Sequence, residues 1–291
     1  MGWALTRRAF LSGSAVLAAG GCTTAPRAAP PGLPPIPRTP EGLPLVDYHV
    51  HLDEIGIDRM VEISRAKGVL FGIVEHAGTK EHKYPVVLGG DDDLRRHLGM
   101  LSGKPVLKGI QAEGLDWMTC FSKAAVAALD YVLTDALTFV ERDGRLVNLW
   151  KKEQVRIDDA QDFMDRYVEH HVKILSTEPI DILANGTFLP EVLQRDFDAL
   201  WTERRMRRII DAAVRHGVAI EINSGFQLPR AGFLRLAKEA GAKFSFGTNG
   251  RRESAVGNLG YSLKMARALG LSAEDCFVPA PPGQKPVERR G

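Results

Sequence analysis

Two histidines stand one residue apart at the end of the first apolar run of the chain, in the segment VDYHVHLDE, residues 46–54. Side chains alternate between the two faces of a strand, so His49, His51 and Asp53 would project in the same direction. Neutral imidazole and carboxylate groups are ligands that zinc, manganese and iron accept. The segment therefore predicts either a metal site at a strand end or merely a polar end to a buried strand.

Six further apolar runs of the chain also end in residues that can bind a metal or a substrate. A lone polar residue at a strand end usually belongs to a polar rim, but this pattern recurs along the whole chain, which favours a functional site. The residues are Glu75, His76, Gln111, Glu113, Asp135, Asn185, Glu221, Asn223 and Asn249.

From residue 44 onward, seven short apolar runs alternate with longer segments of helical pattern. Strands and helices that alternate in this way imply right-handed crossovers and a parallel sheet. The pattern predicts an α/β fold, a seven-stranded distorted TIM-like (β/α)7 barrel, with its active site at the C-terminal ends of the strands. An open doubly wound sheet is the alternative, but no glycine-rich phosphate loop opens any predicted helix.

The segment TFVERDGRLVNLWKKEQVRI, residues 138–157, interrupts the alternation after the fourth run. Asp143 and Gly144, placed between alternating residues, are typical of the turn of a β-hairpin. We expect a hairpin that is inserted at the rim of the site.

The N-terminal segment TRRAFLSGSAVLAAGGC, residues 6–22, predicts an export signal. It resembles a twin-arginine signal, and an ordinary secretory signal is the alternative. The apolar run is shorter than the ~20 residues that a spanning helix needs. Lipoprotein cleavage before Cys22 would leave a lipid anchor. We therefore expect twin-arginine export to a periplasmic or membrane-anchored location, with contact to the membrane only through that anchor.

The chain divides by composition into four segments. They are the export signal 1–22, a proline-rich linker 23–43, the barrel domain 44–275 and a tail 276–291, whose proline-rich segment VPAPPGQKPVERRG, residues 278–291, we expect to be disordered.

The charge is nearly balanced, with 38 basic and 36 acidic residues and a net charge of +2. This balance gives no reason to expect nucleic acid as a partner. The three cysteines have no paired spacing, which argues against a disulfide framework and a cysteine zinc site.

Taken in order, the motifs resemble those of the PHP (polymerase and histidinol phosphatase) domain family. DYHVHL is similar to its opening H-x-H motif, KGIQAEG to its G-x-E motif and AKFSFGTNGRR to its last motif; GIVEHAG, LDYVLTDAL and IDILANGTF are similar to the motifs between. The resemblance covers about residues 44–270. It implies a seven-stranded distorted barrel that binds metal ions and hydrolyses phosphoesters with a metal-activated water.

The resemblance carries over the family's metal ligands unevenly. His49, His51 and His76 stand at ligand positions, whereas Glu113 and Asp135 lie two residues from such positions on the same strand face. These five residues are the predicted ligands for one or two divalent ions, Zn, Mn or Fe. Other ligands of the family are replaced by Gln111, Leu137, Asn185, Asn249 and Arg251.

Arg251 cannot ligate a cation, so its presence argues against a metal ion at its position. It would instead hold a substrate phosphate or carboxylate through a fork of hydrogen bonds. The alternative is that Arg251 and Arg252 simply belong to a basic loop. Asp53 and Arg251 are the predicted catalytic residues. Residues predicted to contact the substrate or support the ligands are Gln111, Asn185, Glu221, Asn223 and Asn249.

The leading hypothesis is an exported metal-dependent hydrolase, a phosphoesterase acting on a small molecule. An amidohydrolase-like enzyme that cleaves a C–N or lactone bond is the second, although no lysine stands at the end of the fourth predicted strand to form a carboxylated bridge. A non-catalytic binding protein with a degenerate metal site is the third, and the replaced ligands motivate it.

Overall fold

Parallel strands form the centre of the molecule. The computed structural model describes residues 1, 32–53, 55–82 and 84–290. Within these ranges, seven parallel strands follow one another in the order β1-β2-β5-β6-β9-β10-β11. Val50 of β1 forms a further parallel bridge with Gly250, just after β11, so the sheet is nearly closed into a barrel. The predicted barrel is confirmed. The strands are β1 (Val46–Val50), β2 (Leu70–Ile73), β5 (Leu107–Ala112), β6 (Tyr131–Thr134), β9 (Ile182–Leu183), β10 (Ala219–Asn223) and β11 (Phe244–Gly247).

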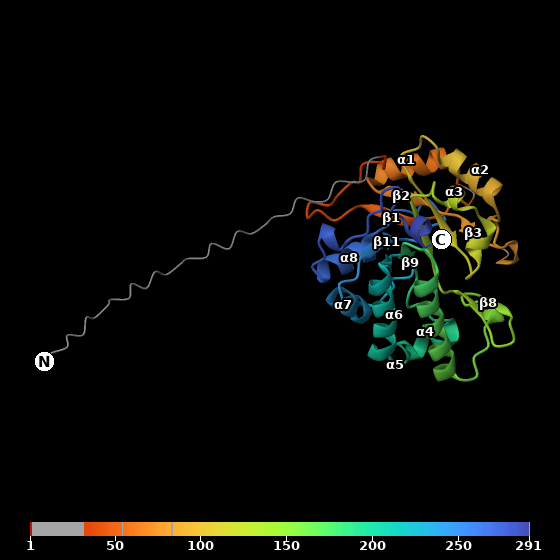
Figure 1. The fold of residues 1–291 in the computed structure, drawn as a ribbon, viewed down its shortest axis with the longest axis vertical. Helices are drawn as coiled ribbons and strands as arrows, with labels where there is room; N and C mark the ends of the chain where they lie inside the picture. Colours follow the sequence, from red (N-terminus) through yellow and green to blue (C-terminus); the bar gives the residue numbers. More distant parts are fainter. Residues whose placement is uncertain (2–31, 54, 83, 291) are drawn as a thin grey trace.

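Helices surround the strands, as Figure 1 shows. Gly68 and Gly217 end α1 and α6 in the left-handed conformation, with φ angles of 63° and 70°, as their positions in the sequence predict. The α-helices are α1 (Ile57–Lys67), α2 (Asp91–Leu101), α3 (Lys123–Val126), α4 (Ala160–Thr177), α5 (Phe197–Leu200), α6 (Glu203–His216), α7 (Ala231–Glu239), α8 (Gly260–Ala268) and α9 (Pro286–Arg289). Short 3-10 turns lie at Lys80–His82, Trp117–Cys120, Lys152–Gln154, Glu191–Asp196 and Ala273–Asp275.

Two short pairings complete the strands. β3 (His76–Ala77) continues the line of β2 and pairs with β5 and with β4 (Val87–Leu88). β7 (Thr138–Val140) and β8 (Leu146–Asn148) pair in antiparallel fashion, which confirms the predicted hairpin.

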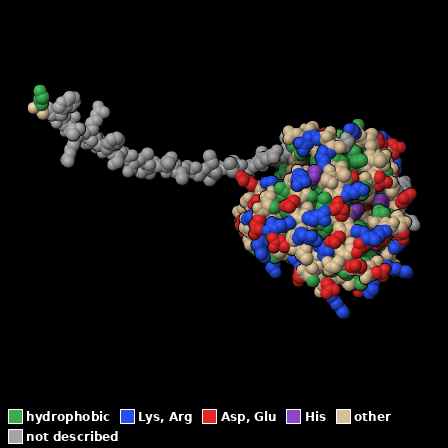
Figure 2. All heavy atoms as spheres, turned by 60° about the horizontal axis from the view of Figure 1, so that its bottom comes forward, with side chains coloured by type: hydrophobic (Ala, Val, Ile, Leu, Met, Phe, Trp, Pro, Cys, Tyr) green, Lys and Arg blue, Asp and Glu red, His purple; other side chains and the backbone are tan. Residues whose placement is uncertain are grey.

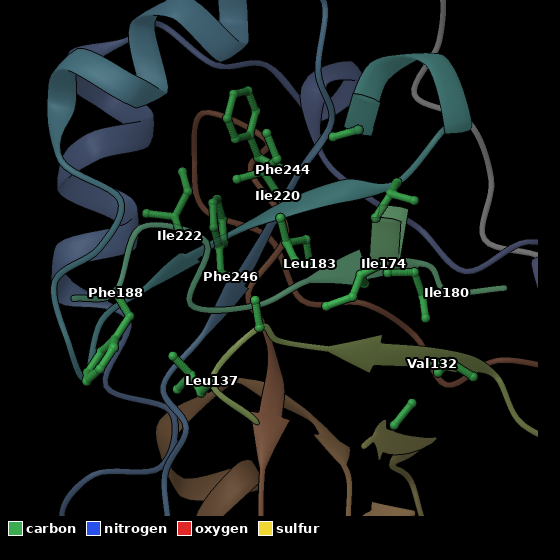
Figure 3. Packing of buried hydrophobic residues seen from close by; sticks show 14 of the residues in the cluster. Val132, Leu137, Ile174, Ile180, Leu183, Phe188, Ile220, Ile222, Phe244 and Phe246 are labelled. Atoms are coloured by element: carbon green, nitrogen blue, oxygen red, sulfur yellow. The ribbon is translucent and has the colours of Figure 1, made fainter. Parts of the chain in front are cut away.

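The apolar residues of the barrel form two clusters. Towards the N-terminal ends of the strands, Tyr48 and Tyr131 pack edge to face inside the barrel, with ring centroids 5.3 Å apart. The strand residues between the inward-facing ones pack with the helices in a second, larger apolar cluster. Figure 3 shows Leu183 and Ile220 in this cluster together with Ile174 of α4. The apolar layer supports the polar residues at the opposite end of the barrel.

The C-terminal tail packs against the barrel, so the prediction of disorder is wrong for residues 278–290. The Phe277 ring lies 5.2 Å from that of Tyr48, whose hydroxyl donates to the Phe277 carbonyl oxygen. The Lys285 ammonium is buried and donates to the carbonyl oxygens of Ala127 and Leu129. Prolines disfavour regular structure, but they do not prevent the side chains between them from packing.

The predicted export signal, residues 1–22, lies outside the described residues except for Met1, so the export prediction stays a prediction. Leu33 and Ile36 of the predicted linker pack against the inner apolar cluster. Among the residues with described structure, no helix is long and apolar enough to cross a membrane. Positive and negative side chains are interspersed on the face that Figure 2 shows.

Candidate functional site

The predicted site residues lie together at the C-terminal end of the barrel, and Gln111 joins several of them. Its Oε1 lies 3.0 Å from His49 Nε2 and 3.1 Å from His51 Nε2. Its Nε2 donates to Glu113 Oε1 at 3.1 Å and to Asp135 Oδ2 at 3.3 Å. The Gln111 amide therefore connects both histidines of the opening segment with the two predicted carboxylate ligands.

His49 forms a buried ion pair with Glu221. The distance from His49 Nδ1 to Glu221 Oε1 is 2.8 Å. Since both ring nitrogens of His49 face acceptor oxygens, both donate and the ring is an imidazolium. Burial lowers the pKa of His49, but the neighbouring carboxylate more than offsets this, so the pKa is raised. Gly247 leaves the space for this pair, because a Cβ at that position would lie 2.0 Å from Glu221 Oε1.

His76 lies between a carboxylate and a guanidinium. Its Nδ1 is 2.8 Å from Glu113 Oε1, and its Nε2 is 3.0 Å from Arg251 Nη2. Because a guanidinium can only donate, His76 Nε2 accepts and the ring is neutral. Burial and the Arg251 charge lower the pKa of His76 to about 3. Arg251 Nη1 also donates to Asp53 Oδ1 at 2.9 Å, so the two predicted catalytic residues form an ion pair at the mouth.

Asparagines complete the network on the far side of the barrel. Asn185 Nδ2 donates to Asp135 Oδ2 at 3.1 Å. Asn223 Nδ2 lies 3.2 Å from Asn185 Oδ1 and 3.0 Å from Glu221 Oε2. The amides therefore link Asp135 back to the partner of His49. Asn249 adjoins the bridge that closes the barrel, and its Oδ1 is buried without a hydrogen-bond partner among the described residues.

Burial raises the pKa of three carboxyl groups in this region. The pKa of Glu113 rises to about 7, although several side chains donate to it, and that of Asp135 rises to about 6. The pKa of Glu75 also rises to about 7, with the nearby Arg251 charge acting in the opposite direction. Carboxyl groups of this kind can exchange protons near neutral pH.

Left-handed backbone conformations concentrate at the mouth. In the described part of the chain, four residues other than glycine have positive φ angles. Asp53, Asn185 and Asn249, at 43°, 53° and 50°, are predicted site residues, and Gln227, at 54°, lies in the loop after β10. Such conformations disfavour most side chains and cluster at functional sites. Their placement favours a functional site over a merely polar rim.

The side chains, as they are arranged, do not fit a metal ion. Among the described residues, no group of three or more His, Cys, Asp and Glu side chains could hold one. A histidine ligand must offer a ring nitrogen without a proton, yet His49 and His51 direct Nε2 to Gln111 and His76 directs Nε2 to Arg251. His51 Nδ1 is buried without a partner, 4.0 Å from Glu75 Oε2. The residues brought together form a hydrogen-bonded network, and metal ligation by them stays a prediction.

Two aromatic residues beside the site were not predicted. The Tyr84 ring stacks on His76 with a centroid distance of 3.5 Å, and the Trp150 ring stacks on Tyr84 at 5.7 Å. The Tyr84 hydroxyl lies 3.3 Å from Glu113 Oε2. Trp150 directly follows the hairpin, so the inserted segment does lie at the rim. An aromatic residue next to an inserted hairpin was the available signal for Trp150, whereas nothing in the sequence marks Tyr84.

Comparison with known proteins gives likenesses of fold. No family model matches the chain, and no curated protein matches it. A histidinol phosphate phosphatase from Lactococcus lactis, solved with zinc, L-histidinol and phosphate, is similar at 12% identity and a TM-score of 0.48, over 79% of this chain and 97% of that chain. An HpcH/Hpal aldolase/citrate lyase family protein from Burkholderia cenocepacia is similar at 15% identity and a TM-score of 0.35, over 78% and 93%. Because both TM-scores are below 0.5, we assign the barrel fold from the strand order of this chain and not from these likenesses.

Proposed function

We propose that the barrel mouth binds a small anionic molecule through Arg251, in a site where protein cations stand in place of metal ions. The position of Arg251 is the observation that carries this proposal. One nitrogen of its guanidinium donates a hydrogen bond to Asp53 and another donates to His76, while 34% of the side chain stays exposed. A guanidinium has five N–H donors, so donors remain for a phosphate or carboxylate.

The interior of the site supports this function in two ways. The His49 imidazolium and the Arg251 guanidinium are the positive groups of the site, and each is paired with one carboxylate, Glu221 and Asp53. Glu75 and Glu113, each with a pKa near 7, supply groups that can accept or release a proton beside a bound molecule. Acid–base chemistry on a bound anion is therefore the class of reaction that these residues support.

A metal-dependent hydrolase is the second candidate, and one observation favours it. His49 and His76 each direct Nδ1 to a carboxylate, Glu221 and Glu113, as metal-binding histidines commonly do. Metal binding would require Gln111 and Arg251 to leave the Nε2 atoms. The phosphoesterase and the C–N or lactone hydrolase of the sequence hypotheses both fall under this candidate.

Replacing Arg251 tests the first candidate. Arg251→Ala is expected to weaken binding of inorganic phosphate about tenfold or more, because a hydrogen bond to a charged group contributes about 1.5–3 kcal/mol. Isothermal titration calorimetry in the presence of a chelator measures this change. Arg252→Ala is the matched control, since Arg252 is an exposed neighbour outside the network. Equal phosphate affinity in the parent protein and in Arg251→Ala would exclude Arg251 as the anchor.

A further inference from the structure

A groove adjoins the mouth of the barrel. Among the described residues, a cavity of about 970 Å³ lies between the segment after the hairpin and the loops that follow β9 and β10. This volume is in the range of small-molecule sites. Its lining is mixed, with Lys152, Glu191, Gln194 and Arg195 beside the apolar residues Leu149, Trp150, Val155, Phe188, Pro190, Val192 and Phe226.

Large apolar side chains in this groove are exposed to solvent. Trp150 is 37% exposed, Val192 63% and Phe226 42%. The Phe188 and Phe226 rings pack edge to face, with centroids 5.5 Å apart, so one wall is formed by packed aromatic rings. Apolar side chains that gather in one exposed place commonly mark a binding surface.

The groove is connected to Arg251 through successive side-chain contacts. Trp150, one wall of the groove, stacks on Tyr84, and Tyr84 stacks on His76. His76 in turn accepts the hydrogen bond from Arg251. Three side-chain contacts therefore connect Arg251 with the groove, at the same end of the barrel.

We infer that the ligand of this site is an anion that carries an apolar or aromatic group, which binds in the groove while the phosphate or carboxylate binds Arg251. The inference rests on the proposed function for the anionic group. The groove has a separate basis, in its volume and its exposed aromatic side chains.

The test compares methylphosphonate with 6-phenylhexylphosphonate, both of which resist hydrolysis, because the hexyl chain can span the His76, Tyr84 and Trp150 rings between Arg251 and the groove. 6-Phenylhexylphosphonate is expected to bind about tenfold more tightly or better, because burial of its phenyl ring in the groove is favourable. Phe226→Ala is expected to remove this difference and to leave methylphosphonate affinity unchanged. Met100→Ala is the matched control, since Met100 is also 42% exposed but lies on α2. Equal affinity of the parent protein for both phosphonates would overturn the inference.

A neutral probe separates failure of the groove from failure of the anionic anchor. If neither phosphonate binds, the proposed function fails, and benzyl alcohol then tests the groove alone. Binding of benzyl alcohol that Phe226→Ala abolishes would support the groove, whereas no binding would overturn it. A dimer in sedimentation that Phe226→Ala dissociates would also overturn the inference, because the groove would then be an interface between copies of the chain.

Discussion

Glu221→Gln is expected to lower the free energy of unfolding by about 3 kcal/mol or more, because it leaves the buried His49 imidazolium without its carboxylate. Both side chains are almost completely buried, and Glu221 also accepts from Asn223 and from the Asn185 backbone. Urea unfolding measures the loss. Glu203→Gln is the control, since Glu203 forms an exposed ion pair with Arg207 on α6. Such a change is expected to cost less than about 0.5 kcal/mol.

The loss of unfolding free energy caused by Glu221→Gln is expected to depend on pH, and the raised pKa of His49 gives the sign of this dependence. The pKa of His49 is raised in the folded state, against about 6.5 in the unfolded chain. The stabilisation by the ion pair is then fully present below pH ~6.5 and is lost as the pH rises through the folded-state pKa. The difference between the parent protein and Glu221→Gln should therefore narrow at alkaline pH. A difference that stays constant as the pH rises would show that His49 is neutral in the folded state.

Combining Arg251→His with Gln111→Glu is expected to create a site for a divalent metal ion. The two changes remove the side chains that face the Nε2 atoms of His49, His51 and His76, and they add an imidazole and a carboxylate. We expect about one equivalent of bound zinc and a melting temperature that falls when a chelator is added. Elemental analysis and thermal unfolding measure the two effects.

The matched control for this double variant combines Arg252→His with Gln111→Glu. It adds the same residue types, but Arg252 is exposed and outside the network, so His76 keeps its contact with Arg251. This control is expected to bind less than about a tenth of an equivalent of zinc. Equal zinc binding by the two double variants would mean that Arg251 does not exclude the ion.

Much of the architecture follows from periodicity in the sequence. Short apolar runs that alternate with helical segments require parallel strands, and parallel strands bring their C-terminal ends to one side. For this reason the order of the runs alone predicts that residues as distant as His49 and Glu221 lie at one mouth. The hairpin at Asp143 and Gly144 follows from local turn chemistry in the same way.

The detailed contacts of the site do not follow from periodicity. Residue type marks Gln111 and Arg251 as replaced ligands, but only the three-dimensional arrangement shows that they face the histidine nitrogens. The stacking of Tyr84 on His76 and of Trp150 on Tyr84 depends on loops, whose course has no regular pattern in the sequence. The tail likewise packs through the partly buried Phe277 and the buried Lys285, and its proline-rich composition gives no sign of this packing.

The metal content of the purified protein tests most directly whether protein cations stand in place of metal ions. The protein is purified without chelators from cells supplied with zinc, manganese and iron, and bound metal is measured by elemental analysis. We expect less than about a tenth of an equivalent in total and no change of melting temperature with a chelator. One or more equivalents of metal, lost in His49→Ala and His76→Ala, would contradict the proposal and favour the metal-dependent hydrolase.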